Sequence, residues 1–369
     1  MTNIKQFTAH PIDHAKAKAT QTPIPNNGEL NSYLATLIEW AYQEQDVRQF
    51  FFAEKTTEVH AALQNLIADD TLSPQADIIA NRLLKKEKER LEEVEHLKGV
   101  HEGMLLQAIF TRDDAPGILL AKVDLSEFLG REDFRSRTGI DKKHRLLKIC
   151  LIELSEKHGI QTVHVGDTNS TIAVYWWKDF LELTEKRTDS SNTKTAFAVF
   201  DTFLGKTLRK DYPRDYPILF NEVLRRFRRN QPFKARQFLN EVFDNYRPSH
   251  NNLDVPDLKR KAASLLDKDK FDANFTILPG EVEKRFKKTY TLTPQIEVTI
   301  DGELENLADQ ISGFALEDGT QGVFIKSDSG FKQFPPRQGI AARRAVTTGH
   351  ATSKQFVAST DKATVKTGQ

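Results

Sequence analysis

A dense group of cations lies between residues 225 and 236, with the sequence Arg-Arg-Phe-Arg-Arg-Asn-Gln-Pro-Phe-Lys-Ala-Arg. An α-helix turns by about 100° per residue, which predicts that the arginines face one way and the apolar residues the other. The outward set is Arg225, Arg226, Arg228 and Arg229, and the inward set is Phe220, Val223, Leu224 and Phe227. Guanidinium groups donate paired hydrogen bonds to phosphate. The segment therefore predicts a helix with a phosphate-binding face, which Lys234 and Arg236 extend.

An alternative interpretation is that these cations form a solvated helix face, or that they pair with acidic neighbours in the fold. The distribution of charge favours a polyanionic ligand. The net charge of the chain is +1, yet the segment 203–236 holds ten Lys and Arg residues against three carboxylates. The segment 332–369 holds seven against one, so the remainder of the chain is acidic. Such polarity orients a protein on a polyanion, of which nucleic acid is the commonest.

Two further basic clusters and a basic tail add to this signal. The first cluster precedes a predicted strand and contains Lys142, Lys143, His144, Arg145 and Lys148. The second contains Lys284, Arg285, Lys287 and Lys288. We predict that the tail is disordered and supplies a mobile second contact through Arg343, Arg344 and Lys354. On a shared surface these groups would follow a phosphate backbone, and their binding would depend on salt and little on sequence.

The sequence signals for catalysis are weaker than those for phosphate binding. Asp124 ends an apolar strand and Asp141-Lys142-Lys143 precedes the next, a layout that resembles metal-dependent nucleases, in which carboxylates hold Mg²⁺ and a lysine assists. This predicts, as an alternative function, a nuclease that uses Asp124, Asp141 and Lys143. The sequence contains no phosphate-binding glycine loop and no serine-nucleophile motif. Cys150 lies in an apolar strand and is expected to be an inert core residue. We therefore predict no catalytic residues, no cofactor and no metal site.

Composition indicates a multi-domain globular protein. The chain has 369 residues, of which 38% are hydrophobic and 28% charged, and no apolar run long enough to span a bilayer. A single cysteine excludes an internal disulfide, and the first residues lack the apolar core of a secretory signal. These features lead us to expect a cytoplasmic protein that does not associate with membranes.

The pattern of apolar residues predicts an α+β fold. Helical spacing is found over 29–42, 56–67 and 74–97. The last of these is expected to be an exposed helix with many ion pairs. Strand-like runs are found over 101–111, 117–125, 146–154 and 161–165. An amphipathic helix over 171–183 would close this N-terminal mixed domain, residues 1–187, whose sheet is expected to be mainly antiparallel. A polar stretch at 188–193 marks its boundary.

A helical region is predicted for residues 194–268, with a helical hairpin formed by 218–230 and 232–246 and a further helix over 254–266. Pro232 would be the first residue of the second helix of the hairpin. A small β-rich unit follows at residues 273–336, with strands over 275–278, 295–300, 322–326 and 330–334. Residues 337–369 form the predicted disordered cationic tail.

Several stretches resemble the bacterial nucleoid-associated protein family of the NdpA/YejK type. They are the opening Ile4–His10, then Ala121–Leu125, the stretch from Gly139 to Lys143 that leads into Leu147–Cys150, Tyr175–Leu181, and the β-rich segment Ile296–Phe334. The resemblance spans roughly residues 4–334 and implies a cytoplasmic, nucleoid-associated DNA-binding protein without a known catalytic site. The chain departs from the family pattern in its long basic tail and its Arg-rich helix.

From these observations we predict a non-enzymatic protein that binds DNA, double-stranded DNA in particular, largely through the phosphate backbone. The residues expected to contact phosphate are Arg225, Arg226, Arg228, Arg229, Lys234, Arg236, Lys142, Lys143, Arg343, Arg344 and Lys354. Besides the nuclease, a second alternative is an adaptor that binds other proteins of DNA-topology or chromosome machinery through its acidic N-terminal helices and β-rich unit. Homo-oligomerisation is left open.

Overall fold

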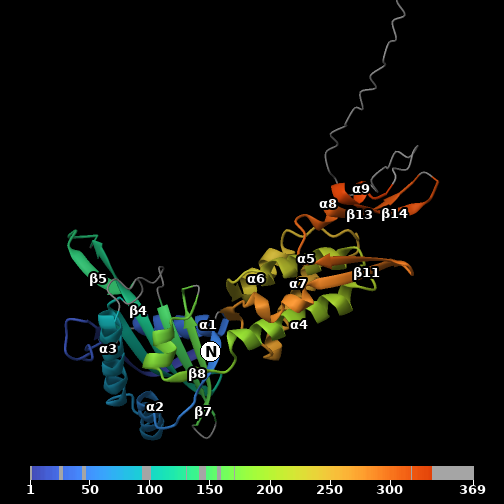
Figure 1. Cartoon of the computed structure of the whole chain (residues 1–369). Coiled ribbons are helices and arrows are strands. Elements are labelled where there is room, and N and C mark those ends of the chain that lie inside the picture. Colours follow the sequence, from blue (N-terminus) through green and yellow to red (C-terminus); the bar gives the residue numbers. More distant parts are fainter. Residues whose placement is uncertain are drawn as a thin grey trace, which may run out of the picture. The chain divides into compact units, whose positions relative to one another are not determined.

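The computed structural model describes residues 2–24, 28–43, 47–93, 101–129, 131–140, 147–155, 159–169, 171–316 and 318–334 (Figure 1). The chain divides into two compact units, Met1–Glu303 and Leu304–Gln369. The fold is α+β, as the sequence predicts. Within the described residues, no helix combines the length and apolar character needed to cross a membrane.

An eight-stranded sheet forms the first half of the larger unit. Its strands lie in the order β1-β3-β4-β6-β7-β2-β8, with β5 paired to the far end of β4, and every pairing is antiparallel. The strands are β1 (Thr2–Ile12), β2 (Arg48–Phe52), β3 (Gly103–Arg112), β4 (Ala115–Leu129), β5 (Ser136–Ile140), β6 (Leu147–Leu154), β7 (Ile160–Asp167) and β8 (Leu183–Glu185). The predicted antiparallel sheet is therefore confirmed.

Helices cover both faces of this sheet. The helix α1 (Gly28–Gln43) packs Leu34, Leu37 and Ile38 against one face of β3, β4 and β6. The helices α2 (Glu58–Asp69) and α3 (Gln75–Glu93), with the π-helical turn η1 (Tyr175–Phe180), pack against the other face. Because both faces are covered, the central strands read as continuous apolar runs rather than as alternating ones.

Three helices and four strands of this half agree with the predicted ranges, and the differences have physical causes. The strands β1, β2, β5 and β8 were not predicted, and the last three are short and carry no distinctive pattern. The predicted helix over 171–183 is wrong, because only the turn η1 forms before the chain enters β8. The helix α3 is not fully exposed as predicted, since Ile79, Leu83 and Glu87 are buried against the sheet.

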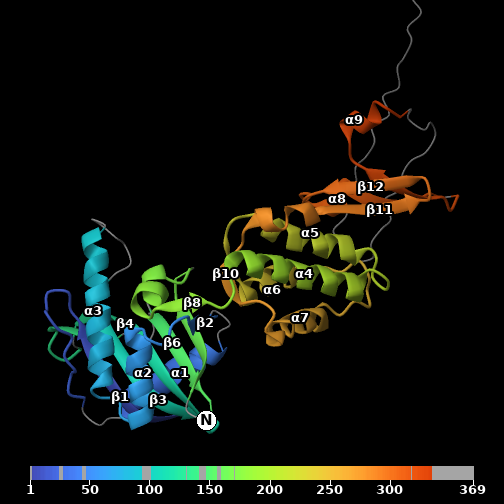
Figure 2. The same cartoon turned by 60° about the horizontal axis from the view of Figure 1, so that its bottom comes forward.

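The second half of the larger unit is a helical body (Figure 2). Its core is rich in phenylalanine. It contains α4 (Asp189–Leu208), α5 (Asp215–Phe227), α6 (Ala235–Phe243) and α7 (Val255–Ala263). The predicted boundary near residue 188 is the start of α4, where the Thr188 hydroxyl accepts a hydrogen bond from the Ser191 amide at 3.2 Å. Phe197, Phe200, Phe227 and Phe233 are almost fully buried, and their rings pack edge-on or tilted.

The predicted helical hairpin of residues 218–246 is confirmed in its two helices and wrong at the junction. Pro232 does not start a helix; it begins the short strand β9 (Pro232–Lys234), which pairs with β10 (Asn274–Thr276). The fixed φ of proline and its missing N–H are compatible with an edge strand as well as with a first helical turn. The presence of proline alone therefore does not decide between a strand and a helix at this position. The helix α6 starts three residues later, at Ala235.

Short elements complete both units. A 3₁₀ turn η2 (Leu266–Lys268) follows α7, and η3 (Pro279–Glu281) and η4 (Glu283–Arg285) precede the hairpin of β11 (Lys287–Thr293) and β12 (Ile296–Asp301). The smaller unit holds α8 (Leu307–Gln310), β13 (Ile311–Ala315), β14 (Gln321–Ile325) and α9 (Asp328–Phe331). The strand predicted over 330–334 is wrong, because the Ser327 hydroxyl accepts the Gly330 amide at 2.9 Å and starts α9. The predicted tail, 337–369, lies outside the described residues.

Candidate nucleic-acid interface

The helix α5 places the Arg-rich segment on the surface of the helical body. Its inner face buries Leu219, Phe220, Val223 and Phe227 in the phenylalanine-rich core. Because this face is strongly apolar, the opposite face must point to solvent. On that side, Arg225 is exposed near the end of the helix, and Arg228 and Arg229 are exposed just beyond it. The predicted burial of one stripe and exposure of the other is confirmed for these three arginines.

Arg225 is exposed but carries a local partner. Its Nη2 lies 2.7 Å from Oε2 of Glu222, one turn earlier on α5. Exposed pairs of this kind contribute little to stability, because both charges remain solvated. The guanidinium of Arg225 can therefore exchange this carboxylate for a phosphate at small cost.

Arg226 does not belong to the outward set. Its side chain is 14% exposed, and its Nε lies 3.0 Å from Oε2 of Glu241 on α6. Burial lowers the pKa of Arg226, while the carboxylate of Glu241 acts in the opposite direction. Arg226 therefore ties α5 to α6, and its predicted contact with phosphate, which stays a prediction, would require this ion pair to open.

Arg228 and Arg229 are the open cations of the group. Both are exposed, and neither forms an ion pair with another described residue. Arg228 is the C-terminal cap of α5, where its backbone N–H bonds to the carbonyl of Leu224 at 3.1 Å. Cations are favoured at a helix C-terminus by the helix dipole. The helix dipole therefore favours a cation at the position of Arg228.

The remaining predicted contacts differ in their surroundings. Lys234 is half-buried in β9 and Arg236 is exposed in the first turn of α6, and both interact with other groups of the fold. The structure therefore does not offer them as free cations. Lys142, Lys143, Arg343, Arg344 and Lys354 lie outside the described residues.

Three cations of the other predicted basic clusters form ion pairs within the fold, and residues 142–145 of the first cluster lie outside the described residues. Lys148 is buried in β6, and its Nζ lies 2.9 Å from Oδ2 of Asp167 on β7. Arg285 and Lys288 both contact the carboxylate of Asp201 on α4, at 3.1 and 3.0 Å. The ammonium of Lys288 also lies 4.5 Å from the ring centre of Phe220. Lys148 and Lys288 are largely buried and stabilise the fold, whereas Arg285 stays about as exposed as Arg225.

Sequence reasoning missed Arg214. This residue immediately precedes α5 with helical backbone angles, and its side chain is exposed. It lies eleven residues before Arg225, and eleven residues are about three helical turns. The two side chains therefore lie on the same face, and Arg214, Arg225, Arg228 and Arg229 form the α5 arginine face. The spacing is visible in the sequence, but a single arginine so far from the dense block at 225–236 forms no pattern until the start of the helix is known.

The nuclease alternative retains one described residue. Asp124 is half-buried on β4, and burial raises its pKa, while Lys122, His101 and Lys148 act to lower it. Asp141 and Lys143 lie outside the described residues, so the structure does not test whether the three meet. Across the described ranges, no three His, Cys, Asp or Glu side chains gather as a metal ion would require. His10 and His14 instead contact Asp77 and Glu87, at 2.7 and 2.9 Å.

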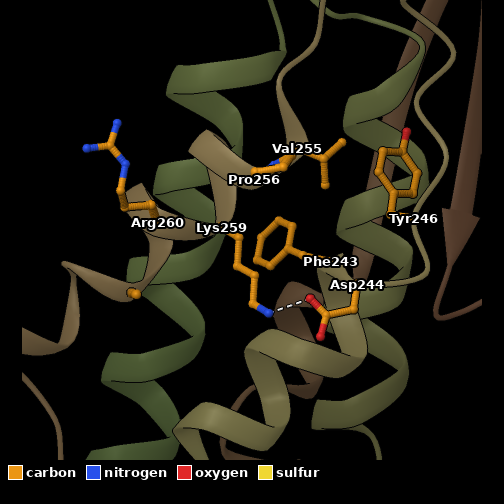
Figure 3. Close-up of a pocket in the computed structure, with 8 residues that line it drawn as sticks. Phe243, Asp244, Tyr246, Val255, Pro256, Lys259 and Arg260 are labelled. Atoms are coloured by element: carbon orange, nitrogen blue, oxygen red, sulfur yellow. Dashed lines mark hydrogen bonds and ion pairs between the residues drawn. The ribbon is translucent and has the colours of Figure 1, made fainter.

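A cavity of about 550 Å³ opens beside α7 and the end of α6 (Figure 3). Apolar walls come from Phe243, Val255, Pro256 and Ala263. Its polar groups already have partners: Lys259 pairs with Asp244, Arg260 with Asp257, and the Tyr246 hydroxyl donates to Asp215. The cavity can accept a small apolar group, but it presents no uncommitted acid, base or nucleophile.

No family model matches this chain, and no curated protein matches it at a significant level. The resemblance to the nucleoid-associated family therefore stays a prediction.

Proposed function

We propose that this protein is a non-catalytic DNA-binding protein that grips the phosphate backbone of duplex DNA with the α5 arginine face. The observation that carries the proposal is the row of exposed guanidiniums along and at the two ends of α5, a helix whose opposite side is anchored in a core: Arg214, Arg225, Arg228 and Arg229. A helix anchored in this way holds its cations in fixed relative positions, which lowers the entropy lost on binding.

The length of the row fits a continuous polyanion. Arg214 and Arg225 are separated by about 16 Å along the helix, at about 1.5 Å per residue. Duplex DNA carries one negative charge per about 1.7 Å of its axis, so the row faces several phosphates at once. Contacts of this kind fix position and contribute affinity without reading bases. The expected binding is salt-dependent and largely independent of sequence.

The test is to measure the affinity for a short duplex DNA by fluorescence anisotropy between about 50 and 200 mM salt. The Arg225→Ala/Arg228→Ala/Arg229→Ala variant should bind more weakly at low salt. The slope of log K against log salt should fall by about 2.7, because each lost phosphate contact reduces it by about 0.9.

A control variant, Lys85→Ala/Lys86→Ala/Arg90→Ala, removes the same number of charges from α3, where these side chains pair with Glu89 and Glu93. It should keep the affinity and slope of the parent protein. Equal losses in both variants would indicate a response to net charge alone, and unchanged binding in both would remove α5 from the interface.

Incubation of the purified protein with plasmid and Mg²⁺ distinguishes the nuclease alternative from non-catalytic DNA binding. Asp124, with a half-buried carboxyl group and a raised pKa, is the observation that favours it, since such groups gather at functional sites. Cleavage that disappears in Asp124→Asn would support this alternative. Intact plasmid, together with salt-dependent binding, would support the proposal above.

A further inference from the structure

Arg228 lies against a glycine of another element. A Cβ atom added to Gly302, which follows β12, would lie 2.8 Å from Nη1 of Arg228 and 3.2 Å from its Cζ. Both distances are shorter than ordinary van der Waals contact, so no larger residue fits without displacing the guanidinium. The end of the Arg228 side chain therefore rests on the backbone at Gly302.

Both sides of this contact are held by the fold. Arg228 caps α5, which is anchored by its apolar face. Gly302 follows Asp301, which pairs with Lys287 in the β11–β12 ladder. The next residue of β11, Lys288, contacts Asp201 of α4 at 3.0 Å. The backbone at Gly302 is thus fixed to the same helical body that carries Arg228.

A long side chain normally loses rotamer freedom when it grips a ligand, and this loss weakens binding. Contact with Gly302 restricts the guanidinium before a ligand arrives. The guanidinium remains exposed and without an ion pair among the described residues, so its N–H groups stay available.

We propose that Gly302 is a positioning residue that pre-orients Arg228 for a phosphate group, an inference that rests on the proposed function of the α5 arginine face. The glycine acts through Arg228 and does not contact the ligand. Two features require glycine at this position, the space needed by the guanidinium and a positive φ of 94°. The experiment must separate these two effects.

The test is a double-mutant cycle of Gly302→Ala and Arg228→Ala in the full chain, read by anisotropy with duplex DNA across a salt series. Gly302→Ala should weaken binding at every salt concentration with little change in the slope of log K against log salt, because Arg228 keeps its charge and loses only its orientation, whereas Arg228→Ala should reduce the slope by about 0.9. In the Arg228→Ala background, Gly302→Ala should change neither affinity nor slope, because the side chain that it displaces is absent.

A matched control is Gly319→Ala. Gly319 also has a positive φ, 83°, but no atom lies within 4 Å of the point that a Cβ would occupy there, so the substitution imposes backbone strain without a clash. It should leave DNA affinity unchanged. Thermal unfolding of each variant reports whether the fold is retained, and the strain cost of Gly302→Ala should be similar with and without Arg228.

The outcomes are distinct. Unchanged DNA binding in Gly302→Ala, with weaker binding in Arg228→Ala, would overturn the positioning role and leave the proposed function standing. Equal losses from Gly302→Ala in both backgrounds would also overturn it, by showing a general structural effect. If Arg228→Ala itself left binding unchanged, the interface as proposed would fail at this residue, and the inference with it.

Discussion

The ammonium of Lys122 on β4 lies 2.6 Å from the carboxylate of Glu87 on α3, and both side chains are almost completely buried. The same carboxylate lies 2.9 Å from Nε2 of His14 and accepts the hydroxyl of Tyr175 at 3.3 Å. One buried acid thus joins the sheet to α3, to the turn η1 and to the segment that follows β1.

We expect Glu87→Gln to destabilise the fold by about 3–5 kcal/mol, because it leaves the buried Lys122 ammonium without a charged partner. The double variant Glu87→Leu/Lys122→Met removes both charges and should recover most of this loss. Chemical denaturation of the two variants and the parent measures the free energies of unfolding. If the double variant is no more stable than Glu87→Gln, the unpaired charge of Lys122 is not the main cause of the lost stability.

Glu222→Gln should strengthen DNA binding. The substitution removes the carboxylate that pairs with Arg225 at 2.7 Å, so the guanidinium no longer has to exchange one anion for another. Affinity for duplex DNA should rise at low salt with little change in slope, because in the proposed interface Arg225 already contacts a phosphate in the parent protein. Stability should change little, because the pair is exposed. Anisotropy titrations across a salt series, with thermal unfolding in parallel, measure both quantities.

Glu241→Gln is the matched control for this prediction. It also removes one carboxylate beside the Arg-rich segment, but its partner Arg226 is largely buried between α5 and α6. We expect it to destabilise the fold by about 1–3 kcal/mol, since a largely buried guanidinium loses the carboxylate with which it forms an ion pair. Its effect on DNA affinity should be smaller than that of Glu222→Gln. The reverse order of affinities would mean that Arg226, rather than Arg225, faces the ligand.

Much of the fold could be read from the sequence, because local patterns reflect burial. The runs over 117–125 and 146–154 predicted strands, and both proved to be central ones, which are apolar throughout because both faces are covered. The strand β2, in contrast, has the sequence Arg-Gln-Phe-Phe-Phe, and its Arg48 is buried by ion pairs with Glu185 and Asp189. A buried arginine cannot be predicted from the local sequence, because its ion-pair partners come from distant segments.

The candidate site was predictable only in part, because residue spacing reports the face of a helix and does not report contacts with distant segments. Periodicity correctly assigned Arg225, Arg228 and Arg229 to the solvent side, although α5 ends at Phe227. It could not place Arg226, which lies at the border of the apolar stripe and becomes buried because α6 brings Glu241 beside it. The contact of Arg228 with Gly302 joins positions more than seventy residues apart in the chain, and no spacing rule predicts it.

Cys150 should resist thiol reagents in the folded protein. Its side chain has no exposed surface on β6, and burial raises the pKa of the thiol, so little thiolate forms and no reagent reaches it. Labelling by an aromatic disulfide should be slower than in the denatured chain by a factor of about a thousand or more, as expected when reaction requires unfolding. Glu87→Gln should accelerate it. Rapid labelling of the native parent would show that β6 is not in the core.

Asp124 gives the fold a pH dependence whose sign can be worked out. Burial raises the pKa of this carboxyl group above its reference value of 3.8, so the folded state binds the proton more tightly than the unfolded chain does. The contribution of Asp124 to stability is therefore greatest below the unfolded pKa and is lost as pH rises through the folded pKa. Lys122 and Lys148, which would favour the charged form, are already paired with Glu87 and Asp167.

Asp124→Asn should therefore stabilise the protein at pH 7 and have little effect near pH 4, with the difference growing between these values. The asparagine cannot ionise, so it avoids the cost of a half-buried negative charge. Thermal unfolding of variant and parent across this pH range measures the difference. Asp69→Asn, at the exposed end of α2, controls for the loss of one negative charge. A variant that is less stable at pH 7 than at pH 4, relative to the parent, would show that the charged form of Asp124 is favoured in the fold, as a site that holds a cation requires.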